Sequence, residues 1–426
     1  MVNWNQSLQY AVLSDIGMRR ANNQDSAAVV LARDDGVWTS RGHLFIVADG
    51  MGAHAAGELA SKLAVDNIPL IYDKLRHLPP PTALAQAIHE ANALIHARGQ
   101  GDAEFQGMGT TCSTLALLPQ GALIAHVGDS RVYRLRGDTL EQLTFDHSLQ
   151  WEMMKAGQIS ESDMPGYIPK NVITRSLGPQ PEVNVDVEGP LPIEQGDKYL
   201  LCSDGLTGQV TDTQLGTILK CFAPREAAQT LIDLSNLRGG PDNITVIIAE
   251  VLGPPLARTH EDEPPSERPI TSARSIPGSW WAAPAVLLLA AVVLGSIGWW
   301  ILAGALLAAA VLSGSLLLRF FRSLSKPPDA APLGGAPYRT ARAVADAEFV
   351  ADLADLAEQL RQLSDEERWP LDGRPLEEKL RTAHGAANRQ ECPEAVMHYG
   401  EAIRLAMQQF RDRRGRPPGG PGDRAR

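Results

Sequence analysis

A run without a charged residue, from Trp280 to Leu318, constrains the architecture of this chain more than any other feature. It is about twice as long as the roughly 20 apolar residues that cross a bilayer once. A single long tilted span and a two-helix hairpin both accommodate the run, and a buried helix of a soluble fold is a weaker alternative. We favour a hairpin that turns near "GSIGWW", because its glycines permit a turn and Trp299 and Trp300 can lie at the headgroup level.

The basic stretch after the run, "RFFRSLSK", predicts on which side of a membrane the flanking parts lie. Lys and Arg accumulate in cytoplasmic segments, so both ends of a hairpin would be cytoplasmic. The first residues, "MVNWNQSLQYAVLSD", lack the basic and then apolar pattern of a secretory signal peptide. We therefore expect a protein of the cytoplasmic (inner) membrane whose folded parts face the cytoplasm.

Composition shifts along the chain predict its domains. Pro, Ser and charged residues dominate the stretch before the run, and Pro and Gly the stretch after it; such segments cannot bury a core. The expected order is a globular domain over 1–252, a flexible linker over 253–279, the membrane segment over 280–318, a second linker over 319–337, a helical domain over 338–413 and a disordered tail over 414–426.

The helical C-terminal part carries amphipathic spacing in "FVADLADLAEQLRQL" and "PEAVMHYGEAIRLAMQQFRDR". A stretch within it weakly resembles one tetratricopeptide-type helix pair, and one such unit cannot bury its apolar face alone. A short bundle that packs on itself or dimerises is favoured over a peptide-binding repeat. We expect self-association or a protein partner through these helices.

Residues 1–252 alternate short β-branched runs with Ala-rich amphipathic stretches, which predicts a mixed α and β domain. The net charge of −11 and pI near 5.4 disfavour nucleic acid as a partner and suit cations better. Four dispersed cysteines without a C-x-x-C pair predict neither a disulfide framework nor a zinc site. Cys112 and Cys202 lie inside apolar runs and are expected in the core.

Carboxylates recur at the ends of the apolar runs. "FIVADG" ends at Asp49, "LIAHVGDS" at Asp129 and "YLLCSDG" at Asp204, while Asp242 in "GGPDNITVIIAE" precedes such a run. Asp-Gly is a common turn signal, so each instance alone is weak. Crowded carboxylates need a compensating cation, and hard divalent ions prefer oxygen ligands. If the strand ends meet, they form a Mg²⁺ or Mn²⁺ site, which the Gly50 carbonyl could approach closely because that residue has no side chain.

Seven stretches resemble, in order, the motifs of the metal-dependent protein phosphatases of the 2C type: "SDIGMRRANNQDS", "VADGMGAHAAGELAS", "GMGTTCSTLAL", "HVGDSRVYRLRGDTLEQLTFDHSL", "NVITRSLG", "LLCSDGLTGQVTD" and "GGPDNITVIIAE". The resemblance covers about the first 250 residues. It implies an α+β fold, a four-layer α-β-β-α sandwich, followed here by the transmembrane hairpin and the small all-α domain. It also implies hydrolysis of phosphoserine and phosphothreonine at two Mn²⁺ or Mg²⁺ ions that activate a bridging water for in-line attack on phosphorus.

The resemblance assigns roles to individual positions. Asp49 would bridge both metals, the Gly50 carbonyl would bind one, and Asp204 and Asp242 would complete the first site. Asp129 matches the residue that holds a weaker third ion in bacterial members, with help from the residue that Asp204 matches. Asp25 would act from the outer shell through metal-bound water. Arg20 matches the phosphate-binding arginine, whose fork fits a phosphate dianion, whereas its neighbour Arg19 is expected to be solvated.

Three positions depart from the family pattern. Gln24 stands where many members have Glu, and Ala53 replaces the second Gly of "DGMGGH", which would be harmful only if that position needed a positive φ. Met51 occupies the slot of the animal general-acid histidine, and His54 is an alternative proton donor; a solvated or capping role for it is favoured. Residues 153–178 match the family's substrate-contacting flap.

The leading hypothesis is a membrane-anchored cytosolic protein serine/threonine phosphatase that reverses a bacterial Ser/Thr kinase. A non-catalytic membrane scaffold that binds phosphoproteins is the alternative, although a scaffold has no need of crowded carboxylates. Another phosphoester hydrolase with the same centre also fits the residues.

Overall fold

The computed structural model describes residues 6–53, 55–159, 172–254, 256, 296, 299–300, 307–308, 333–365 and 373–414. The chain forms two compact units, one of Met1–Thr259 with Pro332–Arg426 and the other of His260–Ala331. The expected hairpin over 280–318 lies almost wholly outside the described residues, and among the residues that are described no helix is long and apolar enough to cross a membrane.

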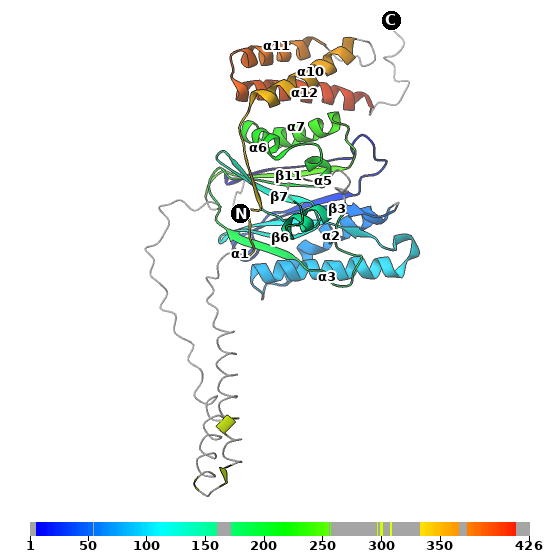
Figure 1. The fold of residues 1–426 in the computed structure, drawn as a ribbon, viewed down its shortest axis with the longest axis vertical. Helices are drawn as coiled ribbons and strands as arrows, with labels where there is room; N and C mark the ends of the chain where they lie inside the picture. Colours follow the sequence, from blue (N-terminus) through cyan, green and yellow to red (C-terminus); the bar gives the residue numbers. More distant parts are fainter. Residues whose placement is uncertain are drawn as a thin grey trace. The chain divides into compact units, whose positions relative to one another are not determined.

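Two sheets form the centre of the first unit (Figure 1), and neighbouring strands run antiparallel. The first sheet has the order β1 (Leu8–Asp15), β11 (Ile244–Val251), β10 (Lys198–Cys202), β7 (Arg131–Arg136), β8 (Thr139–Gln142) and β12 (Arg339–Arg342). The second has the order β2 (Asp25–Val30), β3 (His43–Met51), β5 (Cys112–Leu118), β6 (Gly121–Val127) and β9 (Asp186–Leu191), with β4 (Gly109–Thr110) paired to β3.

Helices cover the outer face of each sheet. Two long helices, α2 (Ala56–Lys74) and α3 (Pro80–Gly101), cover the second sheet, while α6 (Asp212–Cys221) and α7 (Pro224–Leu237) cover the first (Figure 1). Short helices α1 (Asp35–Arg41), α4 (Leu149–Lys155) and α5 (Asp204–Thr207) lie in the connections. This arrangement confirms the expected α-β-β-α sandwich.

The period of two in β3 shows why the layers form. Phe45 and Val47 face the apolar layer between the sheets, and Leu44, Ile46 and Ala48 face the layer beneath α2 and α3. Alternate side chains of a strand point to opposite faces of the sheet. A strand that is apolar at every position is therefore stable only when both faces of the sheet are buried. Cys112 and Cys202 are buried in the core, as expected, where burial raises the pKa of the Cys112 thiol to about 12 and so disfavours the thiolate.

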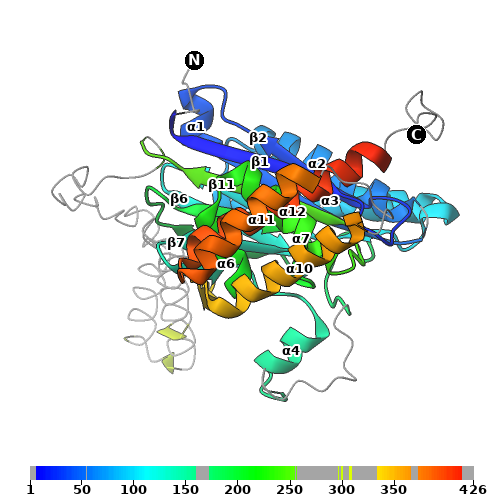
Figure 2. The ribbon, with the colours of Figure 1, turned by 90° about the horizontal axis from the view of Figure 1, so that it is seen from above.

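The C-terminal helices add a further layer. These helices are α10 (Ala347–Asp365), α11 (Gly373–Asn388) and α12 (Cys392–Arg414), and Figure 2 shows them over α6 and α7. Buried side chains of α10 to α12 join those of α7 in one apolar cluster. Gly400 of α12 lies so close to α6 and α7 that a Cβ there would come within 2.7 Å of the Phe222 ring.

Polar contacts fix the same interface. Arg404 donates to the Thr230 hydroxyl at 2.6 Å, and ion pairs join Arg411 to Asp233 and Arg238 to Asp352. The expected amphipathic helices are therefore present, but they belong to the same compact unit as the sandwich, and Arg339–Arg342 before them is a strand. Their apolar faces are occupied within the chain; self-association or a protein partner stays a prediction.

Candidate active site

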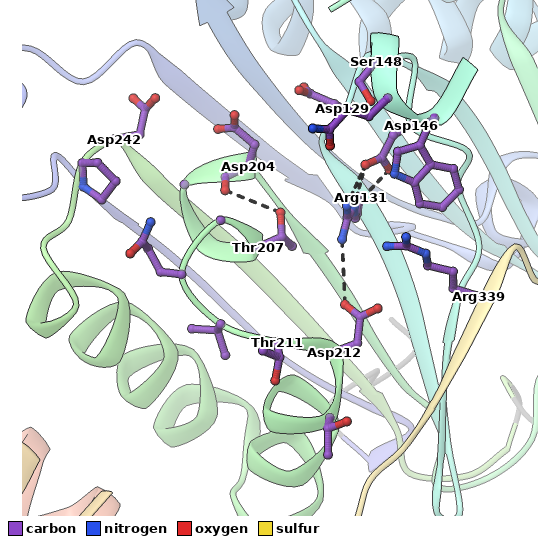
Figure 3. A pocket seen from close by; sticks show the side chains of 18 of the residues that line it. Asp129, Arg131, Asp146, Ser148, Asp204, Thr207, Thr211, Asp212, Asp242 and Arg339 are labelled. Carbon is purple, nitrogen blue, oxygen red and sulfur yellow. Dashed lines mark hydrogen bonds and ion pairs between the residues drawn. The ribbon is translucent and has the colours of Figure 1, made fainter. Parts of the chain in front are cut away.

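The strand-end carboxylates gather at one edge of the sandwich. Asp25 and Asp49 stand directly opposite each other in the register of β2 and β3. Asp204 begins α5 just after β10, Asp242 precedes β11, and Asp129 follows β6. Figure 3 shows Asp242, Asp204 and Asp129 along one side of a pocket.

The pocket has a volume of about 740 Å³ and is open to solvent. Arg20, Asp129, Asp204 and Asp242 contribute to its lining, together with Trp151, Asp212 and Arg339. Asp25, Asp49 and Gly50 are not among its lining residues. The structure thus brings four of the expected site residues to one surface and places the other carboxyls within their electrostatic reach.

Hydroxyl and amide side chains fix one of these carboxyls and the backbone around the others. The Ser203 hydroxyl donates to Asp25 Oδ2 at 2.7 Å, and the Asp49 backbone N–H donates to the Thr111 hydroxyl at 2.9 Å. The Asn243 side chain accepts from Gln24 N at 2.8 Å and donates to the carbonyl of Ile16, which ties the loop before β2 to the start of β11. These supporting residues are not evident from the sequence, where their only signal is their place beside the strand-end aspartates.

Burial and mutual repulsion perturb these carboxyls. Burial raises the pKa of Asp25 to about 6 and that of Asp129 to about 8, with the charge of Asp204 adding to both. The pKa of Asp49 is raised well above its ordinary value by burial and then by the charges of Asp25 and Asp204. Burial and then the Asp242 charge raise the pKa of Asp204, while a hydrogen bond with Asp49 lowers it in part. Carboxyls perturbed in this way beside a pocket are typical of functional sites.

The donor chemistry fits divalent cations. Within the described part of the chain, Asp25 Oδ1 and Asp129 Oδ1 are buried without a hydrogen-bond partner. A hard cation would satisfy such oxygens and favour their ionised forms. No three Asp, Glu, His or Cys side chains of the described residues already converge closely enough to hold one ion. Asp242 is engaged by Arg20 and Asp25 by Ser203, so side chains would have to reorient around an ion.

Arg20 lies at the mouth of the carboxylate cluster. Its Nη2 is 2.6 Å from Asp242 Oδ2, with side-chain exposures of 48% and 27%. Its Nε donates weakly to the Pro241 carbonyl at 3.4 Å. An exposed pair of this kind contributes only about 0–1 kcal/mol, so the guanidinium can leave Asp242 at small cost.

Gly50 has a packing role that differs from the one expected. A Cβ at this position would lie 2.1 Å from the Gly57 carbonyl oxygen and 2.5 Å from that of Gln24. The missing side chain is therefore required by the close approach of β3 to the start of α2. Whether its carbonyl binds a metal stays a prediction.

The structure describes Gln24 and Ala53, two of the positions that depart from the family pattern. Among the described residues only Gln390 is a non-glycine with positive φ, so Ala53 adopts an ordinary backbone conformation and its methyl group causes no backbone strain. The Gln24 amide donates to the Gly52 carbonyl at 3.3 Å. His54, and residues 160–171 of the expected flap, lie outside the described residues.

Comparison with known proteins agrees with this geometry. The chain matches the protein phosphatase 2C family model over residues 18–234. The protein phosphatase PhpP of Streptococcus pneumoniae is 36% identical over 250 residues, 57% of this chain and 98% of PhpP. The solved S. agalactiae serine/threonine phosphatase is 35% identical with a TM-score of 0.51, covering 57% of this chain and 99% of that one. The Mycobacterium tuberculosis serine/threonine phosphatase PstP/Ppp is 34% identical, also with a TM-score of 0.51, covering 58% of this chain and 100% of that one.

The fold and the acidic pocket define the class, a phosphatase of the 2C type. The chain belongs to the protein phosphatase 2C family and is a serine/threonine phosphatase of that family. The expected family and enzyme class are thereby confirmed. The family match ends at residue 234, so β12 and helices α10 to α12 lie beyond it.

Proposed function

We propose that this chain is a metal-dependent phosphatase that removes phosphate from phosphoserine and phosphothreonine of proteins at the cytoplasmic face of a membrane. The observation that carries the catalytic part is the convergence of Asp129, Asp204 and Asp242 with Arg20 in one pocket, within electrostatic reach of Asp49. The relatives named above are bacterial, which supports phosphoproteins made by a bacterial Ser/Thr kinase as substrates.

The residues of the pocket would divide the work. Asp49, the Gly50 carbonyl, Asp204 and Asp242 would hold two Mn²⁺ or Mg²⁺ ions, Asp129 with Asp204 a third, and Asp25 would act from the outer shell. Bound ions would supply a water of lowered pKa and positive charge beside the phosphoryl oxygens. Arg20 binds the phosphate through its forked donors and stabilises the charge that develops in the transition state. His54 is retained only as a candidate proton donor.

Membrane anchoring is supported by the uncharged run over 280–318 and the basic "RFFRSLSK" after it. Both the catalytic unit and the C-terminal helices would then be cytoplasmic, tethered to the inner membrane. Cell fractionation of the full chain and of a chain lacking 280–318 tests this. Recovery of the full chain in the soluble fraction would overturn the anchoring. The hairpin would be overturned if a reporter fused at residue 330, of a kind that works only outside the cytoplasm, proved active.

Phosphate release from a phosphothreonine peptide tests the catalytic proposal. The full chain is the right protein, because removing the C-terminal helices would expose the apolar face of α7. We expect turnover with Mn²⁺, none with EDTA, and a loss of at least about 100-fold in kcat for Asp204→Asn. Asp73→Asn, a surface carboxylate on α2, is the matched control and should behave as the unaltered protein. A folded, Mn²⁺-loaded chain without turnover would instead support the phosphoprotein-binding scaffold.

A further inference from the structure

Residues 333–342, here called the strap, cross from one sheet of the sandwich to the other. Leu333 and Gly189 of β9 exchange backbone hydrogen bonds at 2.8 and 3.0 Å, which fixes one end of the strap to the second sheet. The other end is β12, Arg339–Arg342, which pairs with β8 in the first sheet. The strap is therefore a fixed part of the sandwich, although it lies beyond the family match, which ends at residue 234.

Tyr338 fixes the middle of the strap at three points. Its hydroxyl donates to the buried carboxylate of Glu188, and its backbone N–H donates to the Gln142 carbonyl at 2.9 Å. Its ring meets the Phe145 ring edge-on, with the centroids 5.6 Å apart and the planes at 65°. The polar contacts hold the ring of Tyr338 in place, and the ring in turn restricts Phe145.

Phe145 supports the residue that anchors α4. Of the residues of α4, all of which the structure describes, Trp151 alone is buried. The Phe145 ring meets the Trp151 ring edge-on at 5.1 Å and 89°, and the Arg339 guanidinium of the strap lies over the Trp151 ring, 4.6 Å from its centroid. A helix of seven residues is marginal by itself, so the packing of Trp151 decides where α4 lies.

The helix α4 forms one wall of the active-site pocket. Gln150, Trp151 and Met154 line it, and Ser148, where α4 begins, lies across the pocket from Asp242 (Figure 3). A phosphoryl group bound near Asp242 would leave this wall to the residues that flank the phosphoresidue in a protein substrate. A small phosphate ester would not extend so far.

We propose that Tyr338 is a positioning residue for the binding of protein substrates. Through Phe145 and Trp151, its ring sets the position of α4 and so the contacts that this wall makes with the chain on either side of the phosphoresidue. A segment outside the phosphatase family match thereby shapes the substrate-binding surface of this chain. The inference rests on the proposed function, because a phosphoprotein is the substrate that would meet α4.

Kinetics of the full, Mn²⁺-loaded chain test this role with p-nitrophenyl phosphate and a phosphothreonine peptide as substrates. Tyr338→Ala removes the ring, whereas Tyr338→Phe keeps the ring and loses the hydrogen bond to Glu188, so the two variants separate positioning from anchoring. Phe145→Leu breaks the same link from its other side, and a double variant combines the two losses. Thr340→Ala, an exposed position on β12, is the matched control.

We expect Tyr338→Ala and Phe145→Leu each to raise KM for the peptide by about 3- to 10-fold, the range that the loss of one aromatic pair allows. Their kcat and their kinetics on p-nitrophenyl phosphate should stay within about twofold of the unaltered chain. Tyr338→Phe should keep the peptide KM even where its melting temperature falls, which a merely structural role does not predict. The double variant should lose no more than the larger single loss, because both changes break one link.

Hydrogen exchange of the backbone amides of 149–155 gives a second readout that needs no turnover. Exchange there should quicken by about 3- to 10-fold in Tyr338→Ala and Phe145→Leu and stay unchanged in Tyr338→Phe, with β11 unchanged in all. If Tyr338→Ala does not fold, Phe145→Leu makes the same test. An unchanged peptide KM, an equal loss on both substrates, or Tyr338→Phe behaving as Tyr338→Ala would overturn the role. Absence of p-nitrophenyl phosphate hydrolysis in the unaltered chain would overturn the proposed function, and the exchange comparison would then decide whether Tyr338 positions α4.

Discussion

Asp25 and Asp49 face each other across the antiparallel pair of β2 and β3, a buried carboxyl and a half-buried one at directly opposed positions. Like charges at such positions are destabilising, and burial adds to the cost of ionising either one. The Ser203 hydroxyl donates to the Asp25 carboxylate, and the Thr111 hydroxyl accepts from the Asp49 backbone N–H; no ion pair among the described residues involves either aspartate. The pair therefore costs stability at a place where a divalent cation would be bound, as is common at active sites.

Replacing Asp25 by Asn should stabilise the metal-free chain while impairing catalysis. The pKa of Asp25 is raised from 3.8 to about 6, so above pH 6 its charge costs up to about 3 kcal/mol. Asn keeps an oxygen for the Ser203 hydroxyl and removes the charge. We expect the free energy of unfolding in EDTA to rise by about 1–3 kcal/mol and Mn²⁺-dependent turnover to fall at least about tenfold. Urea unfolding and peptide dephosphorylation measure the two; lower stability of the Asp25→Asn chain would contradict the repulsion argument.

Gly50→Ala should destabilise the fold. Its methyl group would lie 2.1 Å from the Gly57 carbonyl oxygen, which belongs to rigid backbone. Overpacking of this kind costs about 1–3 kcal/mol. Thermal unfolding in EDTA isolates this effect from metal binding. Gly101→Ala is the control, since a Cβ there meets nothing within 4 Å and should leave the melting temperature unchanged or slightly raised; equal melting temperatures for the two variants would refute the packing role.

Arg411→Ala should weaken the packing of α12 against α7 of the sandwich. Asp233 is fully buried, and burial outweighs Arg411 in raising the pKa of its carboxyl to about 6. Loss of Arg411 leaves that carboxyl with the hydrogen bond from Gln229 but without its ion pair, at a cost of about 2–4 kcal/mol. Urea unfolding should show this loss, and adding Asp233→Asn should recover most of it. Arg389→Ala, which breaks an exposed pair with Glu391, is the control and should cost less than about 0.5 kcal/mol.

His43 should lower stability in mild acid, against Asp25 and Asp129, whose raised pKa values favour the folded chain as the pH falls. The buried His43 side chain accepts the Ala32 N–H at Nδ1, and burial lowers its pKa from 6.5 to about 4. Between those pH values the unfolded chain binds a proton that the folded chain excludes, so the contribution is full above pH 6.5 and is lost as the pH falls toward 4. His126, with a pKa lowered to about 3, acts in the same direction.

The His43→Gln variant separates this contribution. As the pH falls over the same range, the free energy of unfolding of the variant should rise relative to that of the unaltered chain, by up to about 1.4 kcal/mol per pH unit at the steepest part. Urea unfolding at closely spaced pH values from neutral into mild acid measures both slopes, whatever the variant's stability at neutral pH. Parallel curves for the two proteins would show that His43 is not excluded from protonation.

Much of this protein is determined by local patterns in its sequence. Apolar runs with strand periodicity are followed by aspartates, and because chain direction and strand length are local properties, Asp49, Asp129 and Asp204 were identifiable as strand-end residues. The amphipathic spacing of the C-terminal helices was equally visible. A residue's own neighbours set these preferences, whatever lies elsewhere in the chain.

The tertiary structure decided what those elements meet. Nothing near Arg339 indicates that it joins β8 and lines a pocket built mostly from residues 129–242. Asp233 and Arg411 are likewise ordinary helix residues until α12 packs on α7. Gly50 shows the same limit, because its necessity comes from the approach of Gly57. Such pairings depend on which apolar surfaces bury one another across long stretches of chain, a global free-energy balance that local periodicity does not encode.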